Sequence, residues 1–120
     1  MEKPVAKEIL TVTGSATYRE RIALPADAVV IVRIEDISLA DAPSITLSEQ
    51  RIRPAGLQVP IPFSLKVQRD KLPGPIRNTL SIRIEDGQGK LLWITDTITP
   101  VEPDNKSMTI DMGTVTLIKV

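Results

Sequence analysis

A short charged segment beside an aromatic residue is the densest group of reactive side chains in this sequence. It reads Tyr18-Arg19-Glu20-Arg21 and follows a long alternating segment. Arg19 and Arg21 would fall on one face of a strand, where two guanidinium groups suit a carboxylate-bearing partner. Alternatively, both arginines pair with acidic residues of a neighbouring strand while Tyr18 packs in the core. The sequence leaves both interpretations open.

The residue types on which most enzyme mechanisms depend are missing. The chain has no histidine and no cysteine, which removes thiol nucleophiles, disulfides and zinc sites built on sulfur or imidazole. It also removes the side chain best suited to proton transfer near neutral pH. No motif places a lysine or a terminal amine to activate a serine or threonine. We therefore predict no catalytic residues, no cofactor and a protein that is not an enzyme.

Acidic residues occur in several predicted turns, at Asp36, Asp41 and Asp86. Calcium binding needs several oxygen ligands that converge from loops, and the chain has no dense run of alternating aspartates. Gly87 and Gly89 lie in a predicted hairpin turn that opens no helix, unlike the glycines of a phosphate-binding loop. These acidic residues are expected to solvate turns, and no metal site is predicted.

Charge balance and aromatic content exclude further classes of partner. Lysine and arginine total 15 and aspartate and glutamate total 15, so the chain has no net field to gather phosphates or anionic lipids. Its aromatic residues are Tyr18, Phe63 and Trp93, too few for stacking on bases or sugars. Nucleic acid is therefore not an expected partner. No segment approaches membrane-spanning length, and the chain as given is expected to be soluble.

Alternation of apolar and polar residues with a period of two dominates the chain and predicts strands. A glycine in the first strand, Gly14, indicates a bulge or a close backbone approach. About seven strands between short turns predict an all-β fold, a single-domain antiparallel β-sandwich, with a small β-barrel as the alternative. The domain is expected to cover residues 8–120, and residues 1–7 are predicted to be disordered or a linker. The predicted strands cover residues 10–24, 29–37, 45–52, 59–67, 80–84, 91–99 and 113–120.

Two further features of the predicted sandwich suggest a partner-binding surface. Pro60 and Pro62 alternate with apolar residues and cannot donate ladder hydrogen bonds, so their strand should lie at a sheet edge. Such an edge can take a partner segment by strand addition or in an apolar groove. Trp93 lies on a strand that is apolar on both faces, so one face is either a binding patch or a second buried surface. The candidate partner-binding residues are Tyr18, Arg19, Arg21, Pro60, Pro62, Phe63 and Trp93.

Several ordered motifs occur over roughly residues 8 to 100. They are Gly14, Tyr18-Arg19-Glu20-Arg21-Ile22-Ala23-Leu24-Pro25, Asp27-Ala28, Asp36, Ser38, Ala40-Asp41-Ala42-Pro43 and Val59-Pro60-Ile61-Pro62-Phe63. Together they resemble the YbaY/YscW-like family of bacterial lipoproteins. The resemblance implies a β-sandwich in the cell envelope. For the pilotin branch of that family, the resemblance implies a lipid-anchored chaperone that binds a secretin subunit of a type III secretion system and helps it reach and assemble in the outer membrane.

The implied function is non-catalytic binding of another envelope protein, as a pilotin-like chaperone for an outer-membrane secretin. The alternative is an envelope module of unassigned role that binds a polysaccharide or a small ligand. The implied location is the periplasmic face of the bacterial outer membrane when the native form is lipidated. Because the chain has no cysteine to acylate, we expect a mature domain whose lipid anchor has been removed, with membrane contact only through that anchor. The alternative is a family member that has no anchor.

Overall fold

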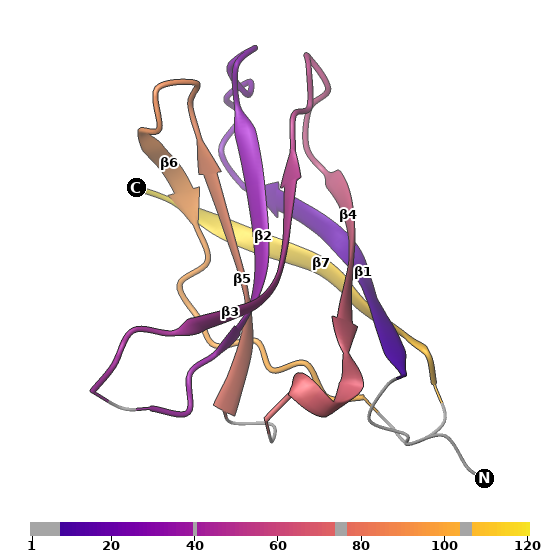
Figure 1. Cartoon of the computed structure of the whole chain (residues 1–120). Coiled ribbons are helices and arrows are strands. Elements are labelled where there is room, and N and C mark those ends of the chain that lie inside the picture. The colour runs from indigo at the N-terminus through magenta and orange to yellow at the C-terminus, as the bar shows by residue number, and fades with distance from the viewer. Residues whose placement is uncertain (1–7, 40, 74–76, 104–106) are drawn as a thin grey trace, which may run out of the picture.

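Seven strands make up almost all of the regular structure in the computed structural model, which describes residues 8–39, 41–73, 77–103 and 107–120 (Figure 1). The prediction of an all-β fold with about seven strands is confirmed. Residues 1–7, predicted to be disordered or a linker, lie outside the described residues. Within those ranges, no helix has the length and apolar character needed to cross a membrane. The elements are β1 (Ile9–Tyr18), β2 (Val29–Asp36), β3 (Ile45–Ile52), β4 (Ile61–Gln68), the short 3-10 helix η2 (Arg69–Lys71), β5 (Asn78–Glu85), β6 (Leu91–Ile94) and β7 (Thr109–Lys119).

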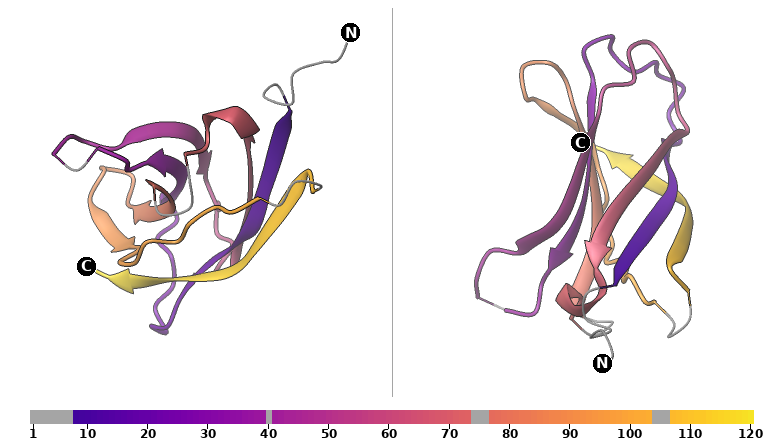
Figure 2. Two further views of the ribbon diagram at one scale, coloured as in Figure 1. Left: turned by 90° about the horizontal axis from the view of Figure 1, so that it is seen from below. Right: turned by 45° about the vertical axis from the view of Figure 1, so that its right-hand side comes forward.

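The strands form one sheet in the order β3-β2-β5-β6-β7-β1-β4. The sheet folds over on itself, so that β7 crosses behind β2 and β5 while β1 passes behind β4 (Figures 1 and 2). It nearly closes, and both the predicted sandwich and the barrel alternative describe it. Neighbouring strands are antiparallel except for β1 and β7, which pair in parallel.

The alternation that predicted the strands places their apolar side chains in one core. Strand β2 is buried on both faces near its start, as is typical of a strand with a neighbour on each side. On β4 the alternation is strict, with every second residue buried and the residues between them exposed. The core includes Leu10, Val12, Ala16 and Tyr18 of β1, Val30, Val32 and Ile34 of β2, Ile61, Phe63, Leu65 and Val67 of β4, and Leu80, Ile82 and Ile84 of β5.

Gly14 lies at both a bulge and a close approach, as its position in the first strand predicted. The register between β1 and β7 shifts between Thr13 and Ser15. A Cβ atom on Gly14 would lie 2.7 Å from the Gly113 carbonyl oxygen and 2.7 Å from Cζ of Phe63. The space that a larger residue needs is therefore already filled by the neighbouring strand and an aromatic ring.

The first strand is shorter than predicted, because β1 ends at Tyr18 and not near Leu24. Beyond Tyr18 the backbone leaves the sheet and bonds to side chains. The backbone N–H of Leu24 donates to Oε1 of Gln58 at 2.7 Å, and the Tyr18 hydroxyl donates to the carbonyl of Ile22. Arg19 and Arg21 consequently lie in a turn and not on a strand.

Other predicted boundaries also differ from the structure. The strand predicted to begin at residue 59 begins at Ile61, and the one predicted to begin at residue 80 begins at Asn78. Two boundaries of β6 and β7 differ by more. Strand β6 ends at Ile94 and not at Thr99, because the chain beyond β6 runs beside β5, where the Leu80 N–H donates to the Thr99 carbonyl at 2.8 Å. Strand β7 begins at Thr109 and not at Gly113, because its first residues pair with β1.

A buried asparagine fixes the segment that follows β6. Asn78, at the start of β5, is fully buried, and its side-chain oxygen accepts the Val101 N–H at 2.7 Å. Its amide nitrogen donates to the carbonyls of Val101 at 3.2 Å and Pro73 at 3.0 Å. These bonds supply polar partners to backbone groups that no strand reaches.

Candidate functional site

An aromatic pair supports the turn that follows β1. The rings of Tyr18 and Trp93 stack with their centroids 4.0 Å apart and their planes 10° from parallel. Tyr18 is 5% exposed and Trp93 2% exposed. Tyr18 therefore packs in the core, and the ring of Trp93 is also covered. Neither ring presents a surface to a partner.

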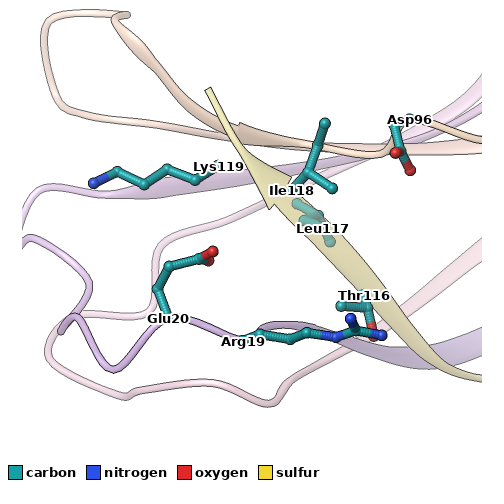
Figure 3. Close-up of a pocket in the computed structure, with 7 residues that line it drawn as sticks. All are labelled: Arg19, Glu20, Asp96, Thr116, Leu117, Ile118 and Lys119. Carbon is teal, nitrogen blue, oxygen red and sulfur yellow. The ribbon is translucent and has the colours of Figure 1, made fainter.

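A pocket of about 500 Å³ lies beside this aromatic pair (Figure 3). The turn after β1 contributes two of its lining residues, the end of β7 contributes four, and the chain just beyond β6 contributes one. In Figure 3 the guanidinium group of Arg19 lies beside Thr116, while the Asp96 carboxylate lies on the other side of β7. The lining residues are Arg19, Glu20, Asp96, Thr116, Leu117, Ile118 and Lys119.

The pocket carries charges of both signs. Glu20 accepts a hydrogen bond from the Trp93 indole N–H at 3.0 Å. This bond is the main reason that the pKa of Glu20 lies below the usual value for a glutamate, and the positive charges of Lys119 and Arg19 lower the pKa further. Glu20 is therefore ionised at neutral pH and faces two cationic side chains.

The two arginines of the segment after β1 are exposed. Among the ion pairs that the described part of the chain forms, none includes Arg19 or Arg21. The interpretation that they pair with acidic residues of a neighbouring strand is therefore not what the structure contains. Both guanidinium groups keep their donors available for a carboxylate outside the chain.

The pocket lies where the chain after β6 separates from β7. The two strands are paired at Trp93 with Lys119 and at Ile94 with Ile118. The next residue, Thr95, instead donates its N–H to the Ile82 carbonyl of β5 at 3.0 Å. Asp96, the residue after Thr95, lines the pocket together with the end of β7.

The proline-containing strand β4 lies at an edge of the sheet, as predicted. Its outer side faces the other edge strand, β3, through side chains: Ser64 N–H donates to Oε1 of Gln50 at 2.9 Å, and Ser48 Oγ donates to the Lys66 carbonyl at 2.6 Å. Alternate residues of an antiparallel strand direct their backbone groups to the same side. Pro62 lies two residues before Ser64, so its missing N–H would have pointed away from β1. The proline therefore removes no hydrogen bond to β1.

The structure divides the seven predicted binding residues between two places. Tyr18, Arg19, Arg21 and Trp93 belong to the end of the molecule where β1 stops. Pro62 and Phe63 lie at the start of β4, and Pro60 directly precedes that strand. Arg19, Arg21, Pro60 and Pro62 are exposed, and Phe63 is 4% exposed and lies in the core. Sequence reasoning missed Asp96, Thr116 and Lys119, because the fold alone brings these positions to Arg19.

Two of the three acidic residues considered for calcium binding, Asp36 and Asp86, accept hydrogen bonds in turns. Asp36 Oδ1 accepts the Ser38 N–H at 2.9 Å and the Ser38 hydroxyl at 2.6 Å. Asp86 Oδ1 accepts the backbone N–H groups of Gln88 and Lys90, each at 2.9 Å. The described residues contain no group of three or more aspartate and glutamate side chains placed to hold a metal ion.

Comparison with known proteins gives one family and two informative relatives. Residues 7–113 match the family described as type III secretion system lipoprotein chaperone (YscW). The chain is 41% identical over 90 residues to the uncharacterized lipoprotein YbaY of Escherichia coli (strain K12), covering 75% of this chain and 47% of that protein. It thus spans about half the length of the curated relative that it matches.

The second relative is a solved structure, that of an alternative pilotin from the type II secretion system of Vibrio cholerae. It matches with a TM-score of 0.78 and 42% sequence identity, over 94% of this chain and 98% of that one. The resemblance that the sequence motifs indicated is confirmed, and the matching family is described as one of chaperones. The chain belongs to the family of type III secretion system lipoprotein chaperones (YscW).

Proposed function

We propose that this chain is a pilotin-like chaperone that binds a secretin subunit and assists its assembly in the outer membrane. In its lipidated native form it acts at the periplasmic face of that membrane. The observation that carries the proposal is the match to the alternative pilotin, which extends over 98% of that chain at a TM-score of 0.78. Nearly the whole of that pilotin domain therefore has a counterpart here.

The turn after β1 is the surface that we assign to the partner. Arg19 and Arg21 are both exposed and lie outside the ion pairs of the described structure. A guanidinium group without an internal partner forms two parallel hydrogen bonds with a carboxylate at little cost in rearrangement. The stacked Tyr18 and Trp93 rings support the turn from the core side, so the arginines extend from an anchored segment.

Capture of the secretin subunit from a detergent-solubilised envelope tests the proposal. The bait is the full-length protein in three forms: wild type, Arg19→Ala/Arg21→Ala and Arg53→Ala/Lys90→Ala. The last form removes two exposed positive charges elsewhere on the molecule and serves as the matched control. We expect wild type and control to capture equal amounts, and the Arg19→Ala/Arg21→Ala form to bind about tenfold more weakly, the equivalent of roughly 1.4 kcal/mol.

The outcomes separate the function from its location. If wild type captures no more secretin than an unrelated β-sandwich domain does, the chaperone function is wrong. If the Arg19→Ala/Arg21→Ala form captures as much as wild type, the partner binds elsewhere. A calorimetric response to envelope glycans together with no secretin capture would favour the polysaccharide-binding alternative.

A further inference from the structure

Backbone pairing between neighbouring strands is missing at two places in the described part of the sheet. Side chains bridge one of these places and not the other. Between β3 and β4 the side chains of Ser48 and Gln50 bond to the backbone of β4. Between β6 and β7, strand pairing stops after Ile94 and Ile118. From Thr109 to Leu117, no strand of the described chain pairs with the side of β7 that faces away from β1.

The backbone of β7 directs hydrogen-bonding groups to this unpaired side. The Val120 N–H donates to the Leu92 carbonyl at 2.9 Å, so the backbone of Val120 points to the β6 side. Alternate residues of a strand direct their backbone groups to the same side. Thr116 and Thr114 therefore direct their N–H and C=O groups to the same side of β7, at positions where β6 no longer pairs with it. Both residues are exposed, and this edge is available for another strand.

The inward face of β7 is less covered than that of the strand beside it. The apolar residues Ile110, Met112 and Val115 are only partly buried, although they pack against the core. Their neighbours Leu10, Val12 and Ala16 on β1 are fully buried. The difference is the exposure expected of a strand that lacks a neighbour on one side, since an added strand would bring its own side chains over this apolar surface.

We propose that this edge of β7 binds an extended segment of the secretin subunit as an added strand, antiparallel to β7 and in line with β6. The segment places apolar side chains against Ile110, Met112 and Val115, and its backbone pairs with Thr114 and Thr116. This inference rests on the chaperone function proposed above and specifies how the partner is bound. It requires only a segment with apolar residues at alternate positions.

The charge beside the edge specifies one further residue of the segment. The Arg19 guanidinium lies next to Thr116, whose side chain is on the outer face of β7 (Figure 3). A residue paired with Thr116 in an added strand would also point to that outer face. An acidic residue at this position would meet Arg19, which forms no ion pair within the described structure.

A second copy of the chain is a poorer occupant of the same edge. The extra residue of β7 in the register shift with β1 falls between Asp111 and Thr114. There Gly113 has a φ of +70° and donates its N–H to Oδ1 of Asp111 at 2.8 Å. Bulges and charged residues on exposed edges discourage self-pairing. The bulge divides the edge, so two copies of β7 would have to align two irregular strands.

Residue-resolved hydrogen exchange on the wild-type protein tests the strand directly. The probe is the tightest-binding member of a set of overlapping synthetic peptides that cover the periplasmic part of the secretin subunit. At saturating peptide we expect exchange of the Thr114 and Thr116 amides to slow at least about tenfold, the effect of a newly formed backbone hydrogen bond. The amide of Lys66, which faces the seam between β3 and β4, should be unchanged.

A proline variant provides the second measurement. Thr116→Pro removes the N–H that the added strand needs, and Lys66→Pro removes the equivalent N–H at the β4 edge as a matched control. We expect peptide affinity to fall about tenfold in Thr116→Pro and to stay unchanged in Lys66→Pro. Thermal unfolding shows whether each variant folds, and if Thr116→Pro does not, the exchange measurement decides.

The outcomes distinguish strand addition, the chaperone function and self-association. If the secretin binds while the exchange of Thr114 and Thr116 is unchanged, strand addition is wrong and the chaperone function stands. If neither the intact secretin nor any peptide binds, the chaperone function fails and this inference fails with it. If the protein alone forms dimers in light scattering and already protects both amides, a second copy occupies the edge and the proposal is overturned.

Discussion

The indole N–H of Trp93 donates a hydrogen bond to Oε1 of Glu20 at 3.0 Å, which links two residues 73 positions apart. Trp93 is buried and Glu20 is exposed, so the bond connects the core to the charged turn that carries Arg19 and Arg21. The partner-binding surface proposed here is thus attached to the aromatic pair beneath it. The bond also gives that surface an optical reporter, because the chain contains one tryptophan.

The fluorescence of Trp93 is expected to report the titration of Glu20. The pKa of Glu20 is lowered, first by the Trp93 hydrogen bond, next by a backbone hydrogen bond and then by the charges of Lys119 and Arg19. The stabilisation from this bond is therefore fully present above the usual glutamate pKa and is lost as the pH falls through the lowered value. We expect a change in Trp93 emission with its midpoint below the usual pKa of a glutamate.

Glu20→Gln is the control for this titration, because glutamine can still accept the indole hydrogen bond but does not titrate in this range. Its emission should stay flat over the same pH interval. A midpoint at or above the usual glutamate pKa in the wild type, or an unchanged transition in Glu20→Gln, would contradict the assignment.

Asn78→Ala is expected to be strongly destabilising. The substitution removes three hydrogen bonds and leaves the N–H and carbonyl of buried Val101 without these partners. A buried backbone group that loses its partner costs about 1–3 kcal/mol, so we expect a loss of about 3 kcal/mol in the free energy of unfolding. Chemical denaturation measures it. Thr97→Ala, at an exposed position of the segment that Asn78 holds, should change stability little.

Gln50→Ala should open the seam between β3 and β4. The Ser64 amide loses its acceptor, so its hydrogen exchange should become faster and stability should fall by about 1 kcal/mol. Arg51→Ala is the control, because Arg51 makes an exposed ion pair with Glu49, and such pairs contribute little. Equal Ser64 exchange rates in wild type and Gln50→Ala would show that this side chain does not hold the seam.

Gly14→Ala should destabilise the fold by about 1–3 kcal/mol, the usual cost of overfilling a packed site. The added Cβ would overlap the Gly113 carbonyl oxygen and the Phe63 ring, each 2.7 Å away. Thermal unfolding of Gly14→Ala beside Ser15→Ala, a change at the next position, measures the effect. Combining Gly14→Ala with Phe63→Leu should recover part of the loss. Equal midpoints for the two single variants would mean that the strands move apart without cost.

Local sequence patterns were enough to predict much of the fold, and long-range contacts determined the rest. Alternation and the two prolines were enough to place β4 at an edge, and Gly14 alone indicated the bulge. The end of β1 was not predictable, because Leu24 is held by a side chain from a distant loop. The burial of Asn78 likewise depends on Val101, and no local signal marks that contact.

The same limit applies to the pocket. The segment around Arg19 was recognisable because its charges are adjacent in the sequence. Asp96 and Lys119 join it only because β6 and β7 end nearby, and each looks like an ordinary exposed residue in its own segment.

In the parallel pairing of β1 with β7, Thr13 lies opposite Asp111. The Thr13 hydroxyl also donates to the carbonyl of Ile110, which is 97 positions away in the sequence. Strand β1 therefore lacks one of its two neighbours until the residues of β7 are present. Closing so long a loop makes assembly slow, because the entropy of the intervening chain is lost before the contact forms. A chain that emerges in order from its amino end leaves this side of β1 unpaired until β7 has been made, and an unpaired strand edge of this kind favours aggregation.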